Sequence, residues 1–335
     1  MTSSLDIRRS PELVSSYIHI PDNVDTFEFD TCFIDECFVL KNIAGYIFKQ
    51  ALQTTSYELD EIRLTKFITL VCDHYHDNPF HNFQHAVNVL HGTYMLLKTT
   101  HIIHKLAPHI VMTSLLSALA HDVDHPGNSN SYEINSVSKY ARIYNDVSVL
   151  ENHHCSLAFE LMEKTELLKA FKDTLFRDVR KTMIACILGT DMTKHTDHLN
   201  KLNAFDFNAT TFTTEEQIFV ASSIVHLADI SNHIKPFETS FEWSKRISQE
   251  FFEQTVKEEI NKLPSLSFMK VHDTLSMCLN EINFVTNVSL PTWKTFAQKF
   301  PQMNEVVDRI HFTLSRWNDI RDKYVSDNDI NALNY

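Results

Sequence analysis

Glycine is the residue that this sequence uses least in comparison with ordinary proteins. The chain has 4 glycines among its 335 residues, far below the usual share of about 7%. Sheets and tight hairpins depend on glycine at their turns, whereas helices joined by short polar loops do not. Strand-like alternation of apolar and polar residues is nowhere sustained either. The sequence therefore predicts an all-α fold.

Helical patterns follow one another along most of the chain. Pro108 occupies a first-turn position ahead of a long apolar run. Two residue pairs have the spacing of a capping box at a helix start: Thr213 with Glu216, and Ser148 with Glu151. With 43% apolar residues, including 24 phenylalanines, the chain can bury one large core.

The first 30 residues differ in character from the rest. They are polar and are interrupted by Pro11 and Pro21, which predicts a loosely ordered leader over residues 1–30. No internal repeat or Gly/Ser-rich linker divides the remaining sequence. We therefore expect one compact domain over residues 31–335.

Charge and cysteine usage exclude several classes of protein. The net charge of −13 argues against a nucleic-acid groove or binding to an anionic membrane. No apolar run approaches the ~20 residues of a membrane span, so we expect no membrane insertion. Six cysteines without a CxxC pair indicate reduced, buried thiols and a cytoplasmic location. An acidic enzyme with an anionic substrate needs local positive charge, which metal ions can supply.

The strongest chemical signal is the run HDVDHPG at residues 121–127. It ends an apolar helix, so His121, Asp122 and His125 bring several ligand atoms to one point. Helix ends also favour histidine, and an aspartate can cap a turn. The complete run nevertheless favours a metal site over these simpler explanations.

Two further elements supply similar ligand types. His81 and His85 are four residues apart, so on a helix they would share one face. Asp229 ends another apolar helix, where a buried carboxylate requires a partner such as a metal ion. Taken alone, Asp229 fits a helix-end or loop position equally well.

The combined set suits two metal ions. Two nitrogens and two oxygens, from His85, His121, Asp122 and Asp229, suit zinc or another transition metal with positions open for water. Asp122 can bridge to a second, harder ion such as Mg²⁺ or Mn²⁺. Two ions about 3.5–4 Å apart can share a hydroxide and clamp a phosphate for in-line attack.

The order and spacing of these motifs resemble the HD superfamily of phosphohydrolases, and more specifically the catalytic domain of class I cyclic nucleotide phosphodiesterases. Five strings carry the resemblance: FHNFQHA at 80–86, HDVDHPGNSN at 121–130, YNDVSVLENHH at 144–154, TDM at 190–192 and ADISN at 228–232. The resemblance implies a fold of about sixteen helices and hydrolysis of 3′,5′-cyclic AMP or GMP to the 5′-monophosphate. Because family members usually carry a regulatory region before this domain, the short leader predicts that such a region is absent from this chain.

The resemblance also implies roles for individual residues. His85, His121, Asp122 and Asp229 match the metal ligands, with zinc at the first site and magnesium or manganese at the second. His81 matches the general acid that protonates the departing O3′. Three residues match the water shell of the second ion: His125, Glu151 and Thr190. The capping-box interpretation of Glu151 is compatible with this role.

Five residues match the base pocket of the family: Asn232, Trp243, Ile247, Glu281 and Phe284. Core packing is an alternative explanation for Trp243, Ile247 and Phe284. Glu281 departs from the family pattern, which has a purine-selective glutamine at this position. An ionised glutamate offers only acceptors, which suits the N1–H and N2–H₂ donors of guanine. A protonated Glu281 would resemble glutamine, and a solvent-facing Glu281 would not read the base.

Two other functions are consistent with parts of the pattern. A degenerate member would bind a nucleotide without turnover, but the complete ligand set and His81 argue against it. Another HD hydrolase would act on a nucleoside triphosphate or a signalling pyrophosphate. Such a site requires a clamp of lysines and arginines near the HD pair, and residues 118–130 contain neither.

Overall fold

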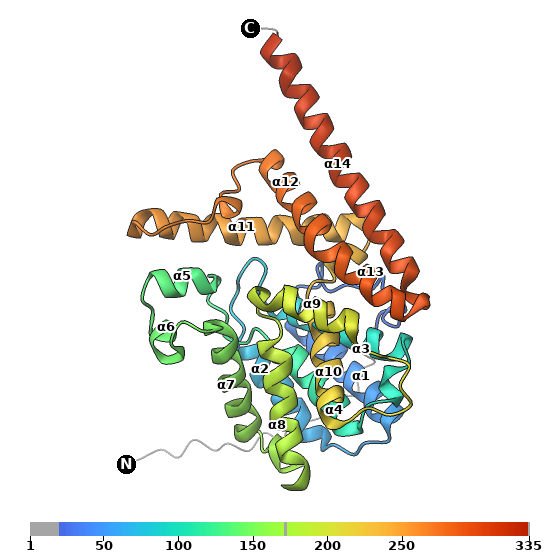
Figure 1. Cartoon of the computed structure of the whole chain (residues 1–335). Coiled ribbons are helices and arrows are strands. Elements are labelled where there is room, and N and C mark those ends of the chain that lie inside the picture. The colour runs from blue at the N-terminus through green and yellow to red at the C-terminus, as the bar shows by residue number, and fades with distance from the viewer. Residues whose placement is uncertain (1–19, 171–172, 334–335) are drawn as a thin grey trace, which may run out of the picture.

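The structure, a computed structural model, describes residues 20–170 and 173–333, and every regular element in these ranges is a helix (Figure 1). The α-helices are α1 (Cys37–Thr55), α2 (Glu61–His74), α3 (Phe83–Thr99), α4 (Pro108–Ala120), α5 (Asn130–Asn135), α6 (Lys139–Tyr144), α7 (Val149–Lys164), α8 (Asp173–Leu188), α9 (His195–Ala204), α10 (Thr214–Asp229), α11 (Phe237–Asn261), α12 (Thr274–Phe284), α13 (Leu290–Lys299) and α14 (Asn304–Leu333).

Short turns connect several of these helices. They are the 3₁₀ segments η1 (Ile102–His104), η2 (Leu167–Ala170), η3 (Met192–Lys194), η4 (Asn232–Ile234), η5 (Ser267–Met269) and η7 (Pro301–Met303), and the π-helical η6 (Val285–Ser289). The all-α prediction is confirmed. The described ranges contain the α-helices α1 to α14, slightly fewer than the expected number of about sixteen.

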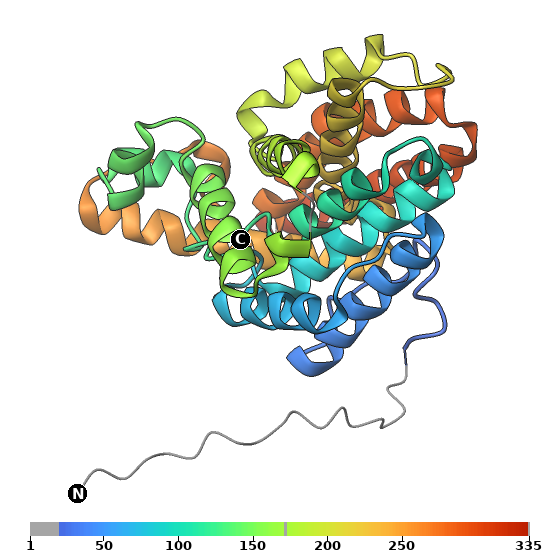
Figure 2. The same ribbon diagram turned by 90° about the horizontal axis from the view of Figure 1, so that it is seen from below.

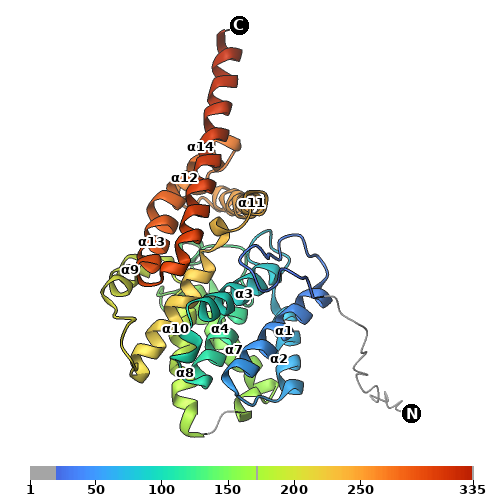
Figure 3. The same cartoon turned by 90° about the vertical axis from the view of Figure 1, so that its right-hand side faces the viewer.

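Helices α3, α4, α8 and α10 pack against one another at the centre of the molecule. Every residue of α4 from Ile110 to Ala120 is buried, because this helix is apolar on all sides and is covered all round. Helices α11, α12 and α14 lie together on one side of this bundle (Figures 1 and 3). A smaller apolar cluster around Trp317 joins them.

Seen from below, the tip of α11 lies beside α5 and α6 (Figure 2). Gln254 of α11 accepts a hydrogen bond from the Ser129 backbone at 2.7 Å, and Lys257 donates one to Asn128 at 2.9 Å. These bonds attach the loop after the HD run to α11. In the described ranges, no helix combines the length and apolarity that crossing a bilayer requires.

Some of the helix starts that the sequence predicted from a proline or a capping box are present, and one is not. Pro108 opens α4, and Thr213 and Glu216 form the predicted capping box. The capping box predicted at Ser148 is wrong: this residue has a φ of 42° and its Oγ donates to Asp191 at 2.6 Å. A partner distant in the sequence therefore replaces the local cap.

The helix expected to carry both His81 and His85 is shorter than predicted. Asn82 is the N-cap of α3, and its side chain accepts a hydrogen bond from the His85 backbone at 3.1 Å. His81 consequently lies in the preceding loop rather than on the same helical face. The two rings still lie 5.9 Å apart.

The N-terminal segment packs on the domain from residue 20 onward. Val24 and Phe29 belong to the main apolar core, and the His91 Nε2 lies 2.8 Å from the Val24 carbonyl oxygen. The boundary expected at residue 30 therefore does not describe residues 20–30, whose apolar side chains have partners in the core. Residues 1–19 of the expected leader lie outside the described residues.

Candidate metal centre

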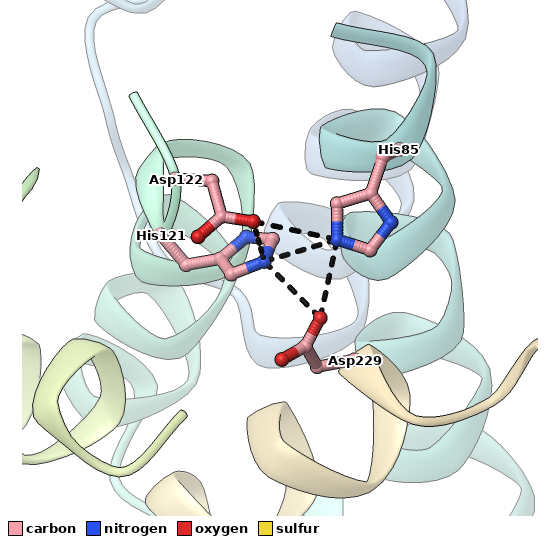
Figure 4. Close-up of side chains that lie close together, drawn as sticks. All are labelled: His85, His121, Asp122 and Asp229. Atoms are coloured by element: carbon pink, nitrogen blue, oxygen red, sulfur yellow. Dashed lines mark hydrogen bonds and ion pairs between the residues drawn. The ribbon is translucent and has the colours of Figure 1, made fainter. Parts of the chain in front are cut away.

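Four side chains from three helix ends meet at one point (Figure 4). His85 lies in the first turn of α3, His121 and Asp122 directly follow α4, and Asp229 is the last residue of α10. These three helices pack against one another, so their ends converge. The structure thereby brings together the four residues that the sequence predicted as metal ligands.

The distances between these side chains fit a common metal ion. His85 Nε2 lies 3.3 Å from His121 Nε2, 3.1 Å from Asp229 Oδ1 and 3.5 Å from Asp122 Oδ2. His121 Nε2 lies 2.9 Å from Asp122 Oδ2 and 3.3 Å from Asp229 Oδ1. Ligand atoms that surround a tetrahedral zinc at 2.0–2.1 Å lie about 3.3 Å from each other. The donor set therefore fits a divalent cation in size and chemistry.

The charges of the cluster also favour a cation. Burial acts to raise the pKa of the Asp122 and Asp229 carboxyls, but His121 and His85 outweigh it and hold both pKa values below the ordinary range. The same carboxylates overcome burial and raise the pKa of His121 well above normal. The cluster therefore attracts positive charge strongly, and a metal ion provides it in place of protons.

Hydrogen bonds behind the cluster orient its members. His121 Nδ1 donates to the Ala118 carbonyl at 2.9 Å, which leaves the Nε2 lone pair facing the other ligands. The Tyr75 hydroxyl donates to the Leu119 carbonyl at 3.1 Å and accepts from the Asp122 backbone at 3.2 Å. Such contacts fix the tautomer and direction of metal ligands.

His81 forms a second group with Glu250 of α11. His81 Nδ1 donates to Glu250 Oε1, and the backbone N–H groups of Phe80 and His81 donate to Glu250 Oε2 at 3.1 Å. Burial lowers the pKa of His81, but the carboxylates of Glu250, Asp122 and Asp229 together outweigh burial and raise this pKa to about 9. These carboxylates favour a protonated His81 imidazole beside the four candidate ligands.

A group of His81, His125 and Glu250 could also hold a cation, because their ligand atoms lie within 4.8 Å of one another. Glu250 already accepts three hydrogen bonds from His81 and Phe80. The His125 ring stacks on His81 at 3.9 Å, and its Nδ1 accepts from the Gly127 backbone at 3.1 Å. These contacts favour a proton-donating group over a separate metal site.

The residues expected around a second ion occupy different surroundings. Burial and the protonated His81 lower the pKa of His125 well below normal, so its Nε2 carries the proton of a neutral ring. Glu151 accepts from Asn130 at 2.9 and 3.0 Å, and burial raises its pKa to about 7. Thr190 donates to the Ile187 carbonyl at 2.8 Å. Within the described residues, no hydrogen bond joins Thr190 to His125 or Glu151.

Two residues expected in the base pocket lie beside the metal ligands. The Trp243 ring packs against His85, with ring centroids 6.1 Å apart. Asn232 begins η4, three residues after Asp229, and its side chain lies 3.4 Å from Asn88. Ile247 follows Trp243 by four residues on the same helix and is half-buried.

Glu281 and Phe284 lie at the end of α12. The Glu281 carboxylate is 2.9 Å from His233 Nε2, and its side chain is 11% exposed. The alternative in which Glu281 points to solvent is therefore wrong. Phe284 packs on the same histidine, with ring centroids 5.6 Å apart.

Sequence reasoning missed Glu250 and His233. Glu250 follows Trp243 by seven residues and Ile247 by three, a spacing that places all three on one face of a helix. An acidic residue on the same helical face as two apolar candidates for the base pocket was the available signal. His233 directly follows Asn232, but nothing local indicates its partner 48 residues away.

Comparisons with known proteins identify the family of this chain. Residues 80–310 match the family described as 3′5′-cyclic nucleotide phosphodiesterase. The chain is 32% identical over 260 residues to a mouse high affinity cGMP-specific 3′,5′-cyclic phosphodiesterase 9A, covering 76% of this chain and 48% of that protein. It is 33% identical over 248 residues to a human high affinity cAMP-specific and IBMX-insensitive 3′,5′-cyclic phosphodiesterase 8A, covering 67% and 30%.

A solved structure gives the same result for the fold. The phosphodiesterase domain of a rhodopsin phosphodiesterase from the choanoflagellate Salpingoeca rosetta superposes with a TM-score of 0.85 at 34% identity, covering 91% of this chain and 94% of that one. The chain spans 17%, 48% and 42% of the fly, mouse and human phosphodiesterase 9A proteins that it matches. It belongs to the 3′,5′-cyclic nucleotide phosphodiesterase family.

Proposed function

We propose that this chain hydrolyses 3′,5′-cyclic nucleotides to 5′-monophosphates and so terminates a cyclic nucleotide signal. The observation that carries the proposal is the convergence of His85, His121, Asp122 and Asp229 at mutual distances of 2.9–3.5 Å, with a protonated His81 beside them. A metal cluster next to a proton donor suits the cleavage of a phosphate ester.

The four ligands would hold the first divalent ion, which we take to be zinc because the set mixes imidazole and carboxylate. Asp122 would also bind a second ion, magnesium or manganese, through its remaining oxygen. Bound there, the ions supply positive charge to the phosphate and lower the pKa of coordinated water. His125, Glu151 and Thr190 are proposed to hold waters around the second ion.

The residues of this chain can protonate the oxygen that leaves when the phosphate ester is cleaved. The oxygen of water bonds to phosphorus and the water loses one proton to the solvent, from which His81 is later reprotonated; the P–O3′ bond breaks, and O3′ leaves with the electron pair. His81 Nε2 donates its proton to O3′, while Nδ1 remains bound to Glu250. Glu250 therefore acts through His81, since it keeps the imidazole protonated and correctly aimed.

The substrate base is proposed to lie against Asn232, Trp243, Ile247, Glu281 and Phe284. The substrate itself is the only partner proposed, with no nucleic acid.

We place the activity in the cytoplasm, where thiols stay reduced. In line with this, burial raises the pKa of five thiols, a property of unreactive cysteines: Cys32, Cys72, Cys155, Cys186 and Cys278.

A turnover assay with Mn²⁺ or Mg²⁺ tests the proposal. The chain should convert cAMP, cGMP or both into 5′-monophosphates, and chelation of the metals should stop the reaction. Nucleoside triphosphates serve as the comparison, because an HD hydrolase of the other type would cleave them instead. A chain that binds a cyclic nucleotide without turnover would indicate a binding module and contradict the proposal.

A further inference from the structure

Glu281 of α12 and His233 of η4 form a buried pair. Their facing atoms, Oε2 and Nε2, lie 2.9 Å apart, and the two side chains are 11% and 7% exposed. Both residues lie far from each other in the sequence and neither is a metal ligand. The pair therefore exists only because η4 and α12 are folded together.

The hydrogen bonds of His233 indicate whether the Glu281 side chain is ionised or protonated. His233 Nδ1 is buried and has no hydrogen-bond partner among the described residues. If Glu281 is ionised, Nε2 carries the hydrogen that it donates, and Nδ1 is a bare lone pair. If Glu281 were protonated and donated to Nε2, the hydrogen would move to Nδ1 and leave a buried N–H without an acceptor, which is the costlier arrangement. The pair therefore favours an ionised, acceptor-only Glu281.

The position of the pair connects it to the metal centre. Asn232, which precedes His233, lies three residues after the metal ligand Asp229 and contacts Asn88 of α3 at 3.4 Å. On the other side of His233, the ring of Phe284 lies 5.6 Å away and is only partly buried. An apolar ring and a carboxylate thus contact the same histidine, which follows the candidate ligand Asp229 by four residues.

We propose that the His233–Glu281 pair reads the base of the substrate and selects guanine over adenine, so that 3′,5′-cyclic GMP is the preferred substrate. Guanine presents N1–H and N2–H₂ side by side, and an acceptor-only carboxylate accepts from both. Adenine would turn the lone pair of N1 toward Glu281. His233 acts as a positioning residue, since its N–H holds the carboxylate in place and in its ionised form. The inference rests on the function proposed above.

The first test compares three cyclic nucleotides as substrates of the whole chain with Mn²⁺ or Mg²⁺. Cyclic IMP keeps the N1–H of guanine but lacks the 2-amino group. The expected order of kcat/KM is cGMP, then cIMP, then cAMP, with about tenfold lost at each step, because one missing or mismatched hydrogen bond in a buried site costs ~1–3 kcal/mol. A preference for cAMP, or equal rates with cGMP and cIMP, overturns the proposal.

Variants identify the residues responsible. Glu281→Gln should reduce the ratio of kcat/KM for cGMP and cAMP about tenfold, mainly through faster hydrolysis of cAMP, because an amide can also donate to adenine N1. His233→Leu should lower the same ratio, and should change it little when Glu281→Gln is already present. Glu259→Gln is the control: it removes the same charge from an exposed position on α11 and should leave the ratio unchanged.

The outcomes separate the inference from the function on which it rests. A chain that hydrolyses no cyclic nucleotide refutes both. A chain that hydrolyses cGMP and cAMP equally well, or a Glu281→Gln variant with the ratio of the parent, refutes the inference alone. If His233→Leu does not fold, the cIMP comparison and Glu281→Gln still decide. A change of equal size caused by His233→Leu with and without Glu281 would show that His233 acts independently of the carboxylate.

Discussion

His121 and Asp229 are expected to be indispensable because each supplies one atom to a four-atom cluster. His121→Ala or Asp229→Ala should lose the bound metal together with nearly all turnover, since three remaining ligands hold a metal less tightly. Metal content measured by elemental analysis should fall in parallel with kcat. A variant that keeps both its metal and its activity would contradict the assignment of the ligands.

His81 is expected to affect proton transfer rather than metal binding. His81→Ala should retain the metal but slow turnover of cyclic nucleotides about 10²–10⁴-fold, the usual contribution of a general acid. A nitrophenyl phosphate ester has a leaving group that needs no proton, so its hydrolysis should slow much less. Equal slowing of both substrates would show that His81 has a structural role instead.

Glu250 is expected to set the pH range of the reaction. In the proposed reaction the protonated form of His81 is the active one, so the rate should be present below its pKa of about 9 and be lost as the pH rises through that value. Glu250→Gln retains a hydrogen-bond acceptor but removes the charge that raises the His81 pKa. The alkaline limb of the kcat/KM profile should therefore move to lower pH.

Bound cations also lower the His81 pKa, so the informative quantity is the difference between parent and variant in the same metal solution. Glu253→Gln is the matched control, because it removes an equal charge from an exposed position on the same helix. It should leave the profile in place. An alkaline limb that is identical in all three proteins would mean that Glu250 does not control His81.

At the scale of elements, the end of α8 approaches α10 so closely that only glycine fits. A Cβ built at Gly189 would lie 2.3 Å from Ser222 Oγ and 2.7 Å from the Ala185 carbonyl oxygen. Gly189→Ala should therefore lower the free energy of unfolding by about 1–3 kcal/mol, the usual cost of overpacking. Denaturant unfolding measures this change.

Gly45 offers a control within α1. A Cβ at this position would contact nothing within 4 Å, and alanine favours a helix interior over glycine by about 0.5–1 kcal/mol. Gly45→Ala should therefore be neutral or stabilising. Equal destabilisation by both substitutions would mean that the contact between α8 and α10 is not the cause.

The elements also show why some sequence signals succeeded and others failed. Thr213 forms its capping box because both members lie within one turn. Ser148 has the same local spacing, but Asp191 lies 43 residues further along the chain and takes its hydroxyl. His85 was predictable from residue type and spacing, whereas the Glu281 partner, His233, was not. Contacts that arise only from the packing of distant helices leave no local pattern in the sequence.

At the scale of the whole molecule, one buried ion pair ties the N-terminal segment to the bundle. Lys235 is 3% exposed; its Nζ donates to the Phe29 carbonyl and lies 3.7 Å from Asp30 Oδ2. Asp30 Oδ1 accepts from Trp243 Nε1 at 3.0 Å and from the Cys32 backbone at 2.7 Å. Through Trp243, which packs on the candidate metal ligand His85, this segment is part of the support of the site.

Asp30→Asn should therefore reduce both stability and activity. Burial already lowers the pKa of Lys235, and Asp30 opposes this effect; without the carboxylate, a buried ammonium loses its counter-charge, which typically costs about 3–5 kcal/mol. Asp25→Asn is the control, because Asp25 pairs with Lys98 at 2.8 Å on the surface, where such a pair contributes about 0–1 kcal/mol. The expected result is a large loss in the free energy of unfolding and weaker metal retention for Asp30→Asn alone. Equal effects of the two substitutions would show that residues 20–36 only cover the bundle and do not support the metal centre.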